Sequence, residues 1–448
     1  MVAQEFLDQI SKFQITNYVG VEDFADKFNF LLTTIVFSIC ASVVSVKLYV
    51  LKPISCYLAV DSSGTNLLNY VENYCWVQGT VPIKYDGKIP TNDAEWNQLQ
   101  KNKILYYQWV PFVLSLQCIM FYIPRIIWQM FCYNRTGTDI QHLITSANHA
   151  VHSSEEARKK MVIHLAKSLE QLLFQHRDFR NDKIANFRRK VYKHCNFLVI
   201  SKRLGNWLVF SYFVLKIIYL SNAIGQLVLM QHFLGLDSNY SFFGIEVARN
   251  ILRGQDWQTT LIFPRVGYCY VKIDMLGSKN AVVAQCVLPV NMLNERIYLF
   301  LWYWVVVVIL LTGISIPTWF IRIMLQKSRH GFVRKYLKLG EEESNKKLKR
   351  YKYLLKKFER DFLRHDGHFL LQMICLNAGD IITAEIVCQL WRIFKTKYIK
   401  RNLNDDNMEN PNSNKPFIIK MEDVVANSFK KQVSLPTAPI FQLEEENN

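Results

Sequence analysis

Residues 299–311 read LFLWYWVVVVILL, thirteen residues without a single charge. A helix made of these residues has no polar face to turn toward water, as a helix on a soluble core requires. Half of the 448 residues are hydrophobic and 20% are charged, so the apolar residues must be concentrated in segments of this kind. The stretch therefore predicts a helix that crosses a membrane.

Four segments of the chain have this apolar character. They cover residues 30–50, 104–130, 207–234 and 297–325. At about 1.5 Å per residue, each is long enough as a helix to cross a hydrocarbon layer about 30 Å thick. The third segment contains Lys216, Asn222 and Gln226, and polar groups at this depth usually face other helices or a water-filled cavity. We therefore predict a bundle or a pore rather than a single anchor.

Residues 369–394 form a fifth apolar stretch that differs from the other four. Asn377, Gly379, Asp380 and Glu385 lie in its middle, and an acid at the centre of a span costs about 2.5–3.5 kcal/mol on insertion scales. We interpret this stretch as two cytosolic helices, with Gly379 ending the first and Asp380 capping the second.

The charge of the connecting segments predicts the orientation in the membrane. Residues 131–206 carry 14 Lys and Arg against 6 acids, and residues 326–401 carry 19 against 8. Residues 51–103 and 235–296 are nearly balanced, with 5 against 5 and 6 against 5. Basic loops favour the cytosolic side, and residues 1–29 lack the pattern of a cleavable signal peptide. We therefore expect both termini in the cytoplasm, and no nucleic-acid binding, because the basic residues flank membrane spans.

Cysteines give an independent indication of the same orientation. The two predicted outer loops each contain a pair, Cys56 with Cys75 and Cys269 with Cys286, and disulfides persist in oxidising compartments. Four cysteines allow three pairings. Bonds within each loop would shape each loop alone, whereas bonds between the loops would join them into one platform suited to docking, since mobile loops lose entropy on binding. The sequence leaves the pairing open.

The predicted fold is an all-α membrane protein with four transmembrane helices, two disulfide-braced extracellular loops and a helical cytoplasmic domain. In chain order we expect a cytoplasmic amino-terminal segment (1–29), a first span (30–50), a first extracellular loop (51–103), a second span (104–130), a cytoplasmic helical loop (131–206), a third span (207–234), a second extracellular loop (235–296), a fourth span (297–325), a cytoplasmic helical region (326–401) and a disordered tail (402–448).

Signatures of catalysis and of metal binding are weak. The pairs His149/His152 and His365/His368 have the spacing of metal ligands, but no third ligand follows in register. There is no glycine-rich phosphate loop and no nucleophile elbow. We therefore predict no enzyme, no metal site and no cofactor. Asn239 begins a glycosylation sequon just outside the third span, and its closeness to the bilayer makes it a weak candidate.

Several short motifs resemble those of the innexins, the invertebrate gap-junction family. The motif at the start of the second span consists of Tyr106, Tyr107, Gln108, Trp109, Val110 and Pro111. Further matching motifs are KPISC at 52–56, ENYCWV at 72–77, FPRV at 263–266, QCVLP at 285–289 with Asn291, Asn294 and Glu295, and NAGD at 377–380. The similarity runs in order from about residue 20 to 395.

The resemblance implies an oligomeric channel subunit. Octameric half-channels, homomeric or mixed with other innexins, would dock with those of an adjacent cell at a plasma-membrane junction. The resemblance places Met1–Phe13 at the pore mouth and Phe30–Leu58 along the pore wall, and it implies the disulfides Cys56–Cys286 and Cys75–Cys269. The pore-lining candidates are Val2, Glu5, Phe6, Asp8 and Gln9. From the residues alone, Val2–Ile15 fits equally an amphipathic helix on the membrane surface.

We expect a gap-junction channel subunit, surrounded by membrane lipid, that passes ions and small molecules with selectivity set by pore width and charge. Two alternatives stay open at this point. One is an undocked large-pore half-channel of the plasma membrane, in which the outer platform serves stability alone. The other is a four-span adhesion or scaffold protein without a pore.

Overall fold

The computed structural model describes residues 20–58, 65–83, 92–136, 140–175, 205–235, 263–275, 278–340 and 349–409, with residues 90, 244, 245, 249 and 253. The chain divides into two units, residues 1–391 and 392–448. In the second unit the described part is the end of one helix, Arg392–Glu409, which continues past the predicted start of the tail.

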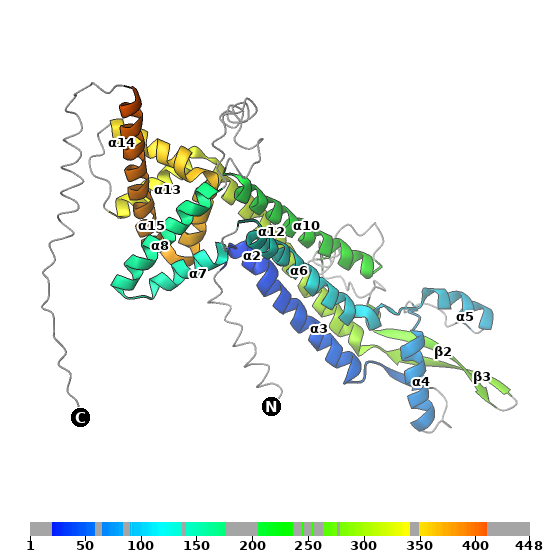
Figure 1. The fold of residues 1–448 in the computed structure, drawn as a ribbon. Coiled ribbons are helices and arrows are strands. Elements are labelled where there is room, and N and C mark those ends of the chain that lie inside the picture. Colours follow the sequence, from blue (N-terminus) through cyan, green and yellow to red (C-terminus); the bar gives the residue numbers. More distant parts are fainter. Residues whose placement is uncertain are drawn as a thin grey trace, which may run out of the picture. The chain divides into compact units, whose positions relative to one another are not determined.

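Four long apolar helices form a bundle (Figure 1). The first is built from α2 (Phe24–Lys27), the π-helical turn η2 (Phe28–Leu32) and α3 (Thr33–Tyr49). The others are α6 (Tyr106–Thr136), α10 (Trp207–Phe233) and α12 (Pro289–Met324). Helix α3 packs against α6, and α10 packs against both α12 and α6. The prediction of a four-helix membrane fold is confirmed.

Two of these helices begin earlier than the apolar segments that predicted them. Helix α2 begins at Phe24 because Asp23 and Asp26 form a capping box, in which each carboxylate accepts a hydrogen bond from the other residue's backbone N–H. Helix α12 begins at Pro289 rather than near residue 297. Proline suits the first turn of a helix because its fixed φ is helical and its missing N–H has no partner there.

A three-stranded antiparallel sheet lies at one end of the bundle (Figure 1). Its strands are β1 (Ser55–Leu58), β2 (Val266–Met275) and β3 (Ser278–Val287), in the order β1-β3-β2. Helices α4 (Thr65–Gln78) and α5 (Asp93–Leu99) and the 3₁₀ turn η3 (Gln100–Asn102) belong to the same loop as β1. The predicted all-α fold does not include this sheet, although β2 is rich in the β-branched and aromatic residues that favour strands.

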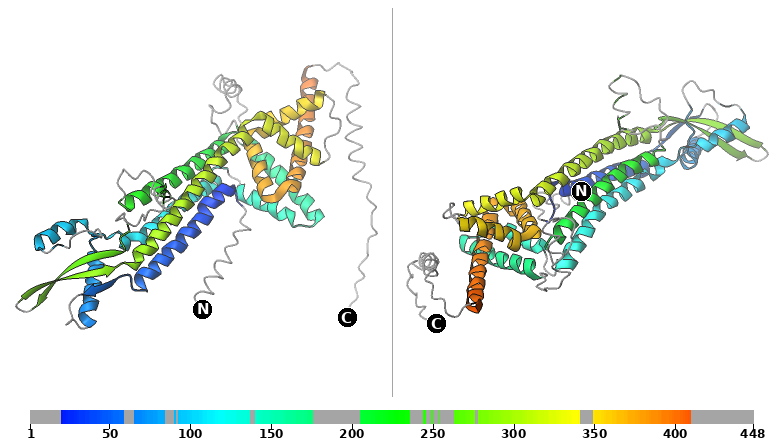
Figure 2. Two further views of the ribbon diagram at one scale, coloured as in Figure 1. Left: turned by 180° about the vertical axis from the view of Figure 1, so that it is seen from behind. Right: turned by 90° about the horizontal axis from the view of Figure 1, so that it is seen from above.

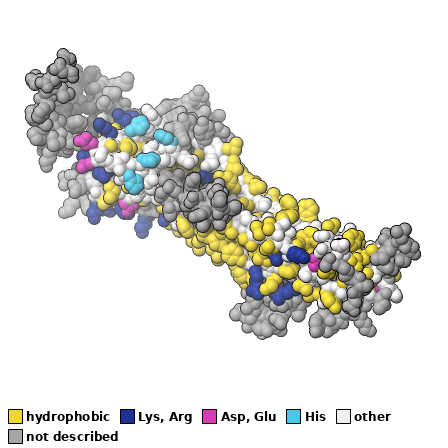
Figure 3. Space-filling model, turned by 90° about the horizontal axis from the view of Figure 1, so that it is seen from below, with side chains coloured by type: hydrophobic (Ala, Val, Ile, Leu, Met, Phe, Trp, Pro, Cys, Tyr) yellow, Lys and Arg dark blue, Asp and Glu magenta, His cyan; other side chains and the backbone are white. Residues whose placement is uncertain are grey.

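A group of helices lies at the other end of the bundle (Figure 2). It contains α7 (Ile140–Val151), α8 (Glu155–Gln175), α13 (Gln326–Leu339), α14 (Lys349–Lys357), the π-helical turn η6 (Phe358–Leu363) and the first part of α15 (Arg364–Glu409). On the face shown in Figure 3, apolar side chains cover the bundle between two regions where charged side chains gather.

The helices that contain the fifth apolar stretch have two breaks in helical geometry, one before residue 369 and one within the stretch. Residues 351–397 are long and apolar enough to cross a membrane by composition alone. However, Arg364 (φ 55°, ψ −160°) and Gly379 (φ 80°, ψ 178°) have non-helical backbone angles. The break at Gly379 is where the sequence predicts one, and a positive φ there is available to glycine without strain. In the apolar window of residues 351–397, 61% of the residues are buried within the chain, against 33–39% in the corresponding windows of the four bundle helices. These helices therefore pack in the interior of the chain.

Candidate functional site

Two disulfides join segments that are far apart in the sequence. Cys56 of β1 is bonded to Cys286 of β3, and Cys75 of α4 is bonded to Cys269 of β2, with sequence separations of 230 and 194 residues. Cys56 and Cys286 lie directly opposite each other in the β1–β3 register. Both bonds therefore run between the two loops, which is the pairing that the innexin resemblance implies. We call β1, β2, β3 and α4 the disulfide platform.

The platform has an apolar interior built around these bonds. The four bonded cysteines are at most 7% exposed, and they share a buried cluster with Ile54, Val71, Val271, Ala284 and Leu288. The sulfur atoms of Cys56, Cys75 and Cys286 lie within 4.8 Å of one another, which is the spacing of metal ligands. All three are consumed in disulfides, so none offers the thiolate that a metal requires.

The motif that opens α6 attaches the platform to the bundle. The fully buried ring of Tyr107 lies 4.9 Å from the ring of Trp76 on α4. The side-chain amide of Gln108 donates a hydrogen bond of 2.6 Å to the carbonyl oxygen of Trp76. Gly79 ends α4 with φ +83°, and a Cβ at this position would lie 2.8 Å from the carbonyl oxygen of Ile104. A close turn that only glycine permits therefore brings α4 onto the start of α6.

Other residues of this motif point in different directions. The ring of Tyr106 makes edge contacts with Phe233 of α10 and with Phe263, at centroid distances of 6.1 and 6.0 Å. Pro111 is buried within α6. Trp109, in contrast, is 62% exposed. The motif thus packs the platform against two bundle helices and leaves one large aromatic side chain for lipid or a neighbouring molecule.

A second junction joins the platform to α12. The guanidinium of Arg265, beside β2, lies 3.4 Å from the carboxylate of Glu295. The side-chain amide of Asn291 donates a hydrogen bond of 3.0 Å to the carbonyl oxygen of Pro264. Asn291 and Glu295 are both buried. The motifs around residues 263–266 and 291–295 therefore contact each other through polar groups that are largely buried.

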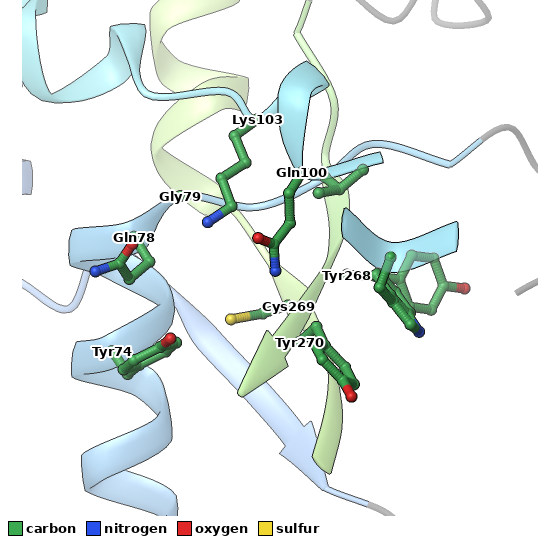
Figure 4. A pocket seen from close by; sticks show the side chains of 10 residues that line it. Tyr74, Gln78, Gly79, Gln100, Lys103, Tyr268, Cys269 and Tyr270 are labelled. Atoms are coloured by element: carbon green, nitrogen blue, oxygen red, sulfur yellow. The ribbon is translucent and has the colours of Figure 1, made fainter. Parts of the chain in front are cut away.

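A small pocket lies beside the Cys75–Cys269 bond (Figure 4). Tyr74 and Gln78 of α4 and Tyr268 and Tyr270 of β2 contribute to its lining, and Trp96 stacks on Tyr270 with ring centroids 5.3 Å apart. The pocket has room for about one water molecule. It is therefore too small to bind an organic ligand.

One face of α3 has no partner within the described part of the chain. Its exposed residues are Ser38, Ile39, Ser42, Val43 and Val46, which recur at helical spacing. The hydroxyl of Ser42 donates to the carbonyl oxygen of Ser38, one turn earlier. This face combines small polar and aliphatic groups, whereas the opposite face packs against α6.

The pore-lining candidates of the amino-terminal segment cannot be placed. Val2, Glu5, Phe6, Asp8 and Gln9 lie outside the described residues, and so does the glycosylation candidate Asn239. Their roles stay predictions.

A buried ion cluster, which the sequence does not predict, lies at the bundle end opposite the platform. Lys216 of α10 is fully buried, and its Nζ lies 2.7 Å from a carboxylate oxygen of Asp23 and 2.8 Å from one of Asp26. The sequence places Lys216 in a span and indicates that it faces other helices, but it does not show the partners. The available signal was the pair of acids directly before the first span. We call Asp23, Asp26 and Lys216 the ion cluster.

The NAGD motif at residues 377–380 joins α15 to α13. The carboxylate of Asp380 accepts hydrogen bonds of 2.7 Å from the Tyr336 hydroxyl and 3.1 Å from the Lys335 ammonium. Burial, with Cys375 and Asp380 close by, raises the pKa of Tyr336, so its hydroxyl keeps the proton that it donates. Asp380 is therefore bound by side chains of α13 and does not make the helix cap that the sequence predicts.

The geometry defines a class of protein. Four apolar helices, with two loops cross-linked into a single unit at one end, make a multi-pass helical membrane protein. Residues 22–394 match the innexin family model. The chain belongs to the innexin family, the subunits of invertebrate gap-junction channels.

Individual relatives are similar along most of their length. The chain is 32% identical over 377 residues to "Innexin unc-9" of Caenorhabditis elegans. The matched region covers 83% of this chain and 91% of that relative. The chain is 31% identical over 385 residues to "Innexin-12" of the same species, covering 84% and 89%. It is 28% identical over 395 residues to "Innexin-19" of Caenorhabditis briggsae, covering 84% and 87%.

Proposed function

We propose that eight copies of this chain form a half-channel, and that two half-channels dock through their disulfide platforms to connect adjacent cells. The platform then lies outside the cell, and both termini and the helices α7, α8 and α13–α15 lie in the cytoplasm. The ring forms alone or together with other innexins.

The disulfide platform is the observation that carries this proposal. Two bonds that span 230 and 194 residues hold both loops in one packed unit, and the motif residues Tyr107 and Gln108 fix that unit to α6. A preorganised surface loses little conformational entropy on docking. The charge bias of the connecting segments supports the orientation, because the basic loops are those opposite the platform.

The exposed face of α3 supports its assignment to the conduit. A helix turned entirely toward lipid needs no hydroxyl groups, whereas Ser38 and Ser42 are both exposed on this face. In the proposed ring α3 lines the pore, and the predicted residues Val2, Glu5, Phe6, Asp8 and Gln9 narrow its cytoplasmic mouth. Glu5 and Asp8, repeated around the ring, favour cations, while the basic cytoplasmic segments oppose this preference.

Recording from paired cells tests the proposal. We expect current across the contact when both cells express the chain, and none when either cell lacks it. Current in single-cell membranes without current across contacts would support an undocked half-channel instead. Purified protein in liposomes that passes neither dye nor ions would support the scaffold alternative and refute a channel.

A further inference from the structure

Residues 20–29, which we call the entry segment, contain several polar side chains, and most of these are buried, although Phe24 in the same segment is exposed. Asp26 and Asn29 have no exposed surface, and Glu22 and Asp23 are also buried. Charged side chains are rarely buried unless they are paired. The partners of this segment therefore determine where it lies.

Lys216 of α10 supplies the positive charge for the acids of the entry segment. Its ammonium lies 2.7 Å from Asp23 and 2.8 Å from Asp26, and it donates a further hydrogen bond of 2.9 Å to the hydroxyl of Ser315 on α12. One cation therefore holds two carboxylates of the entry segment against two bundle helices.

Side chains of α10 and α12 complete the contacts of these carboxylates. The second oxygen of Asp23 accepts hydrogen bonds of 2.6 Å from both Ser315 and the indole N–H of Trp319. The second oxygen of Asp26 accepts one of 2.7 Å from the Tyr212 hydroxyl. These bonds leave little freedom for the carboxylates to move without losing several partners together.

The helix type changes where the entry segment leads into α3. The π-helical turn Phe28–Leu32 begins in the last two residues of the entry segment and ends at the start of α3, and π turns within α-helices occur frequently at functional sites. Asn29, in this turn, donates a hydrogen bond of 2.7 Å to Thr312 of α12. The segment is thus held by α10 and α12, rather than only by continuity with α3.

Helix α15 also contacts the entry segment and the residues that hold it. The side-chain amide of Asn377 donates a hydrogen bond of 3.1 Å to the carbonyl oxygen of Gly20. The ring of Phe369 lies 4.9 Å from Tyr212 and 5.7 Å from Trp319. Helix α15 therefore contacts the entry segment directly, through Asn377, which lies just before the break at Gly379.

We infer that Lys216 is a positioning residue that fixes the entry segment, and that Asn377 transmits to this segment the position of α15. The inference rests on the proposed function, in which the residues preceding Gly20 form the pore mouth. Lys216 is fully buried, so it acts on permeation through the entry segment and not by contact with ions. Through the ion cluster, the position of α15 thereby affects the opening of the pore.

Two substitutions perturb this arrangement by different amounts. Lys216→Met removes the cation that contacts both buried carboxylates, so the entry segment must move toward water or take up protons. Asn377→Ala removes one hydrogen bond to Gly20 and keeps the ion cluster. Lys159→Met is the matched control, because it breaks an ion pair of 2.8 Å whose side chains are 66% and 70% exposed.

The first readout is the open probability of half-channels in single cells expressing the full chain, normalised to protein at the surface. We expect a change of about tenfold for Lys216→Met, about threefold for Asn377→Ala and none for Lys159→Met, as a shift in a two-state equilibrium. If Lys216→Met does not reach the surface, Asn377→Ala decides. Wild-type gating in either variant at wild-type surface level would overturn the inference.

The second readout does not depend on current. A cysteine introduced by Val21→Cys lies at a buried position of the entry segment, and its labelling by a thiol reagent is followed by mass spectrometry of the peptide. We expect labelling roughly tenfold faster when Lys216→Met or Asn377→Ala is added, since local opening limits the reaction. Unchanged labelling would overturn the inference. A wild-type chain that carries no current would instead refute the proposed function, and the labelling result would still stand.

Discussion

The two ends of the bundle are held together by different kinds of bond. At the platform, covalent bonds join segments 194 and 230 residues apart. At the opposite end, one lysine and two carboxylates join the entry segment to α10. Disulfides keep a single arrangement in an oxidising compartment. In contrast, the charged groups of an ion cluster can replace their contacts to one another with contacts to water when a helix moves. The difference suits a surface that must match a partner at one end, and a part that must change position at the other.

Breaking the covalent side of this comparison has the largest expected effect. Cys56→Ser removes the β1–β3 cross-link. Because the Cys75–Cys269 bond remains, the lost bond closes a loop of about 40 residues, for which the loop-entropy model gives a loss of about 4 kcal/mol in the free energy of unfolding. We expect current between paired cells to disappear while the protein still inserts in the membrane. Cys118→Ser is the control and should leave coupling unchanged, because it replaces a free cysteine of α6 and serine can make the same hydrogen bond to the carbonyl oxygen of Thr34.

Removing the cation from the ion cluster tests the other side. Lys216→Met should lower the free energy of unfolding by about 3–5 kcal/mol, because it removes the cation that contacts both buried acids. Thermal unfolding of the purified protein in detergent, followed by circular dichroism, measures the loss. A variant as stable as wild type would mean that the acids of the entry segment find other partners.

Weakening the junction between platform and bundle tests how firmly the platform must be attached to α6. Gln108→Ala removes the hydrogen bond to the carbonyl of Trp76, at an expected cost of about 1 kcal/mol. We expect a partial loss of junctional current, with half-channel current unchanged. Gln98→Ala, at an exposed position of α5, should affect neither current.

An exposed ion pair should have the smallest effect. Lys159→Met breaks the pair with Glu155 on α8, and such pairs contribute about 0.3–0.5 kcal/mol. The free energy of unfolding, measured by thermal unfolding, should decrease by no more than this amount. A loss as large as that of Lys216→Met would show that burial does not distinguish the two lysines.

The four bundle helices could be predicted from sequence because a span needs a long apolar run, and that signal is local. The helix break at Gly379 could also be predicted, because the acids around it make a continuous span costly. The first residues of α2 and α12 are harder to predict from the sequence. They depend on a capping box and on Pro289, both of which lie outside the apolar runs.

The contacts between distant segments could not be predicted from the residues alone. Strand β1 pairs with β3 across more than 200 residues, and β1 is too short for an alternating pattern to be recognised. The pairing of Cys56 with Cys286 was implied only by the family resemblance. Lys216 was recognised as a polar residue in a span, but Asp23 and Asp26 become its partners only when α2 packs between α10 and α12.

Recording junctional and half-channel currents from the same Cys56→Ser cells shows whether the cross-linked platform serves docking. If the cross-linked platform serves docking, junctional current is lost while single-cell half-channel current persists. Junctional current at the wild-type level, with the Cys56–Cys286 bond absent, would contradict this account.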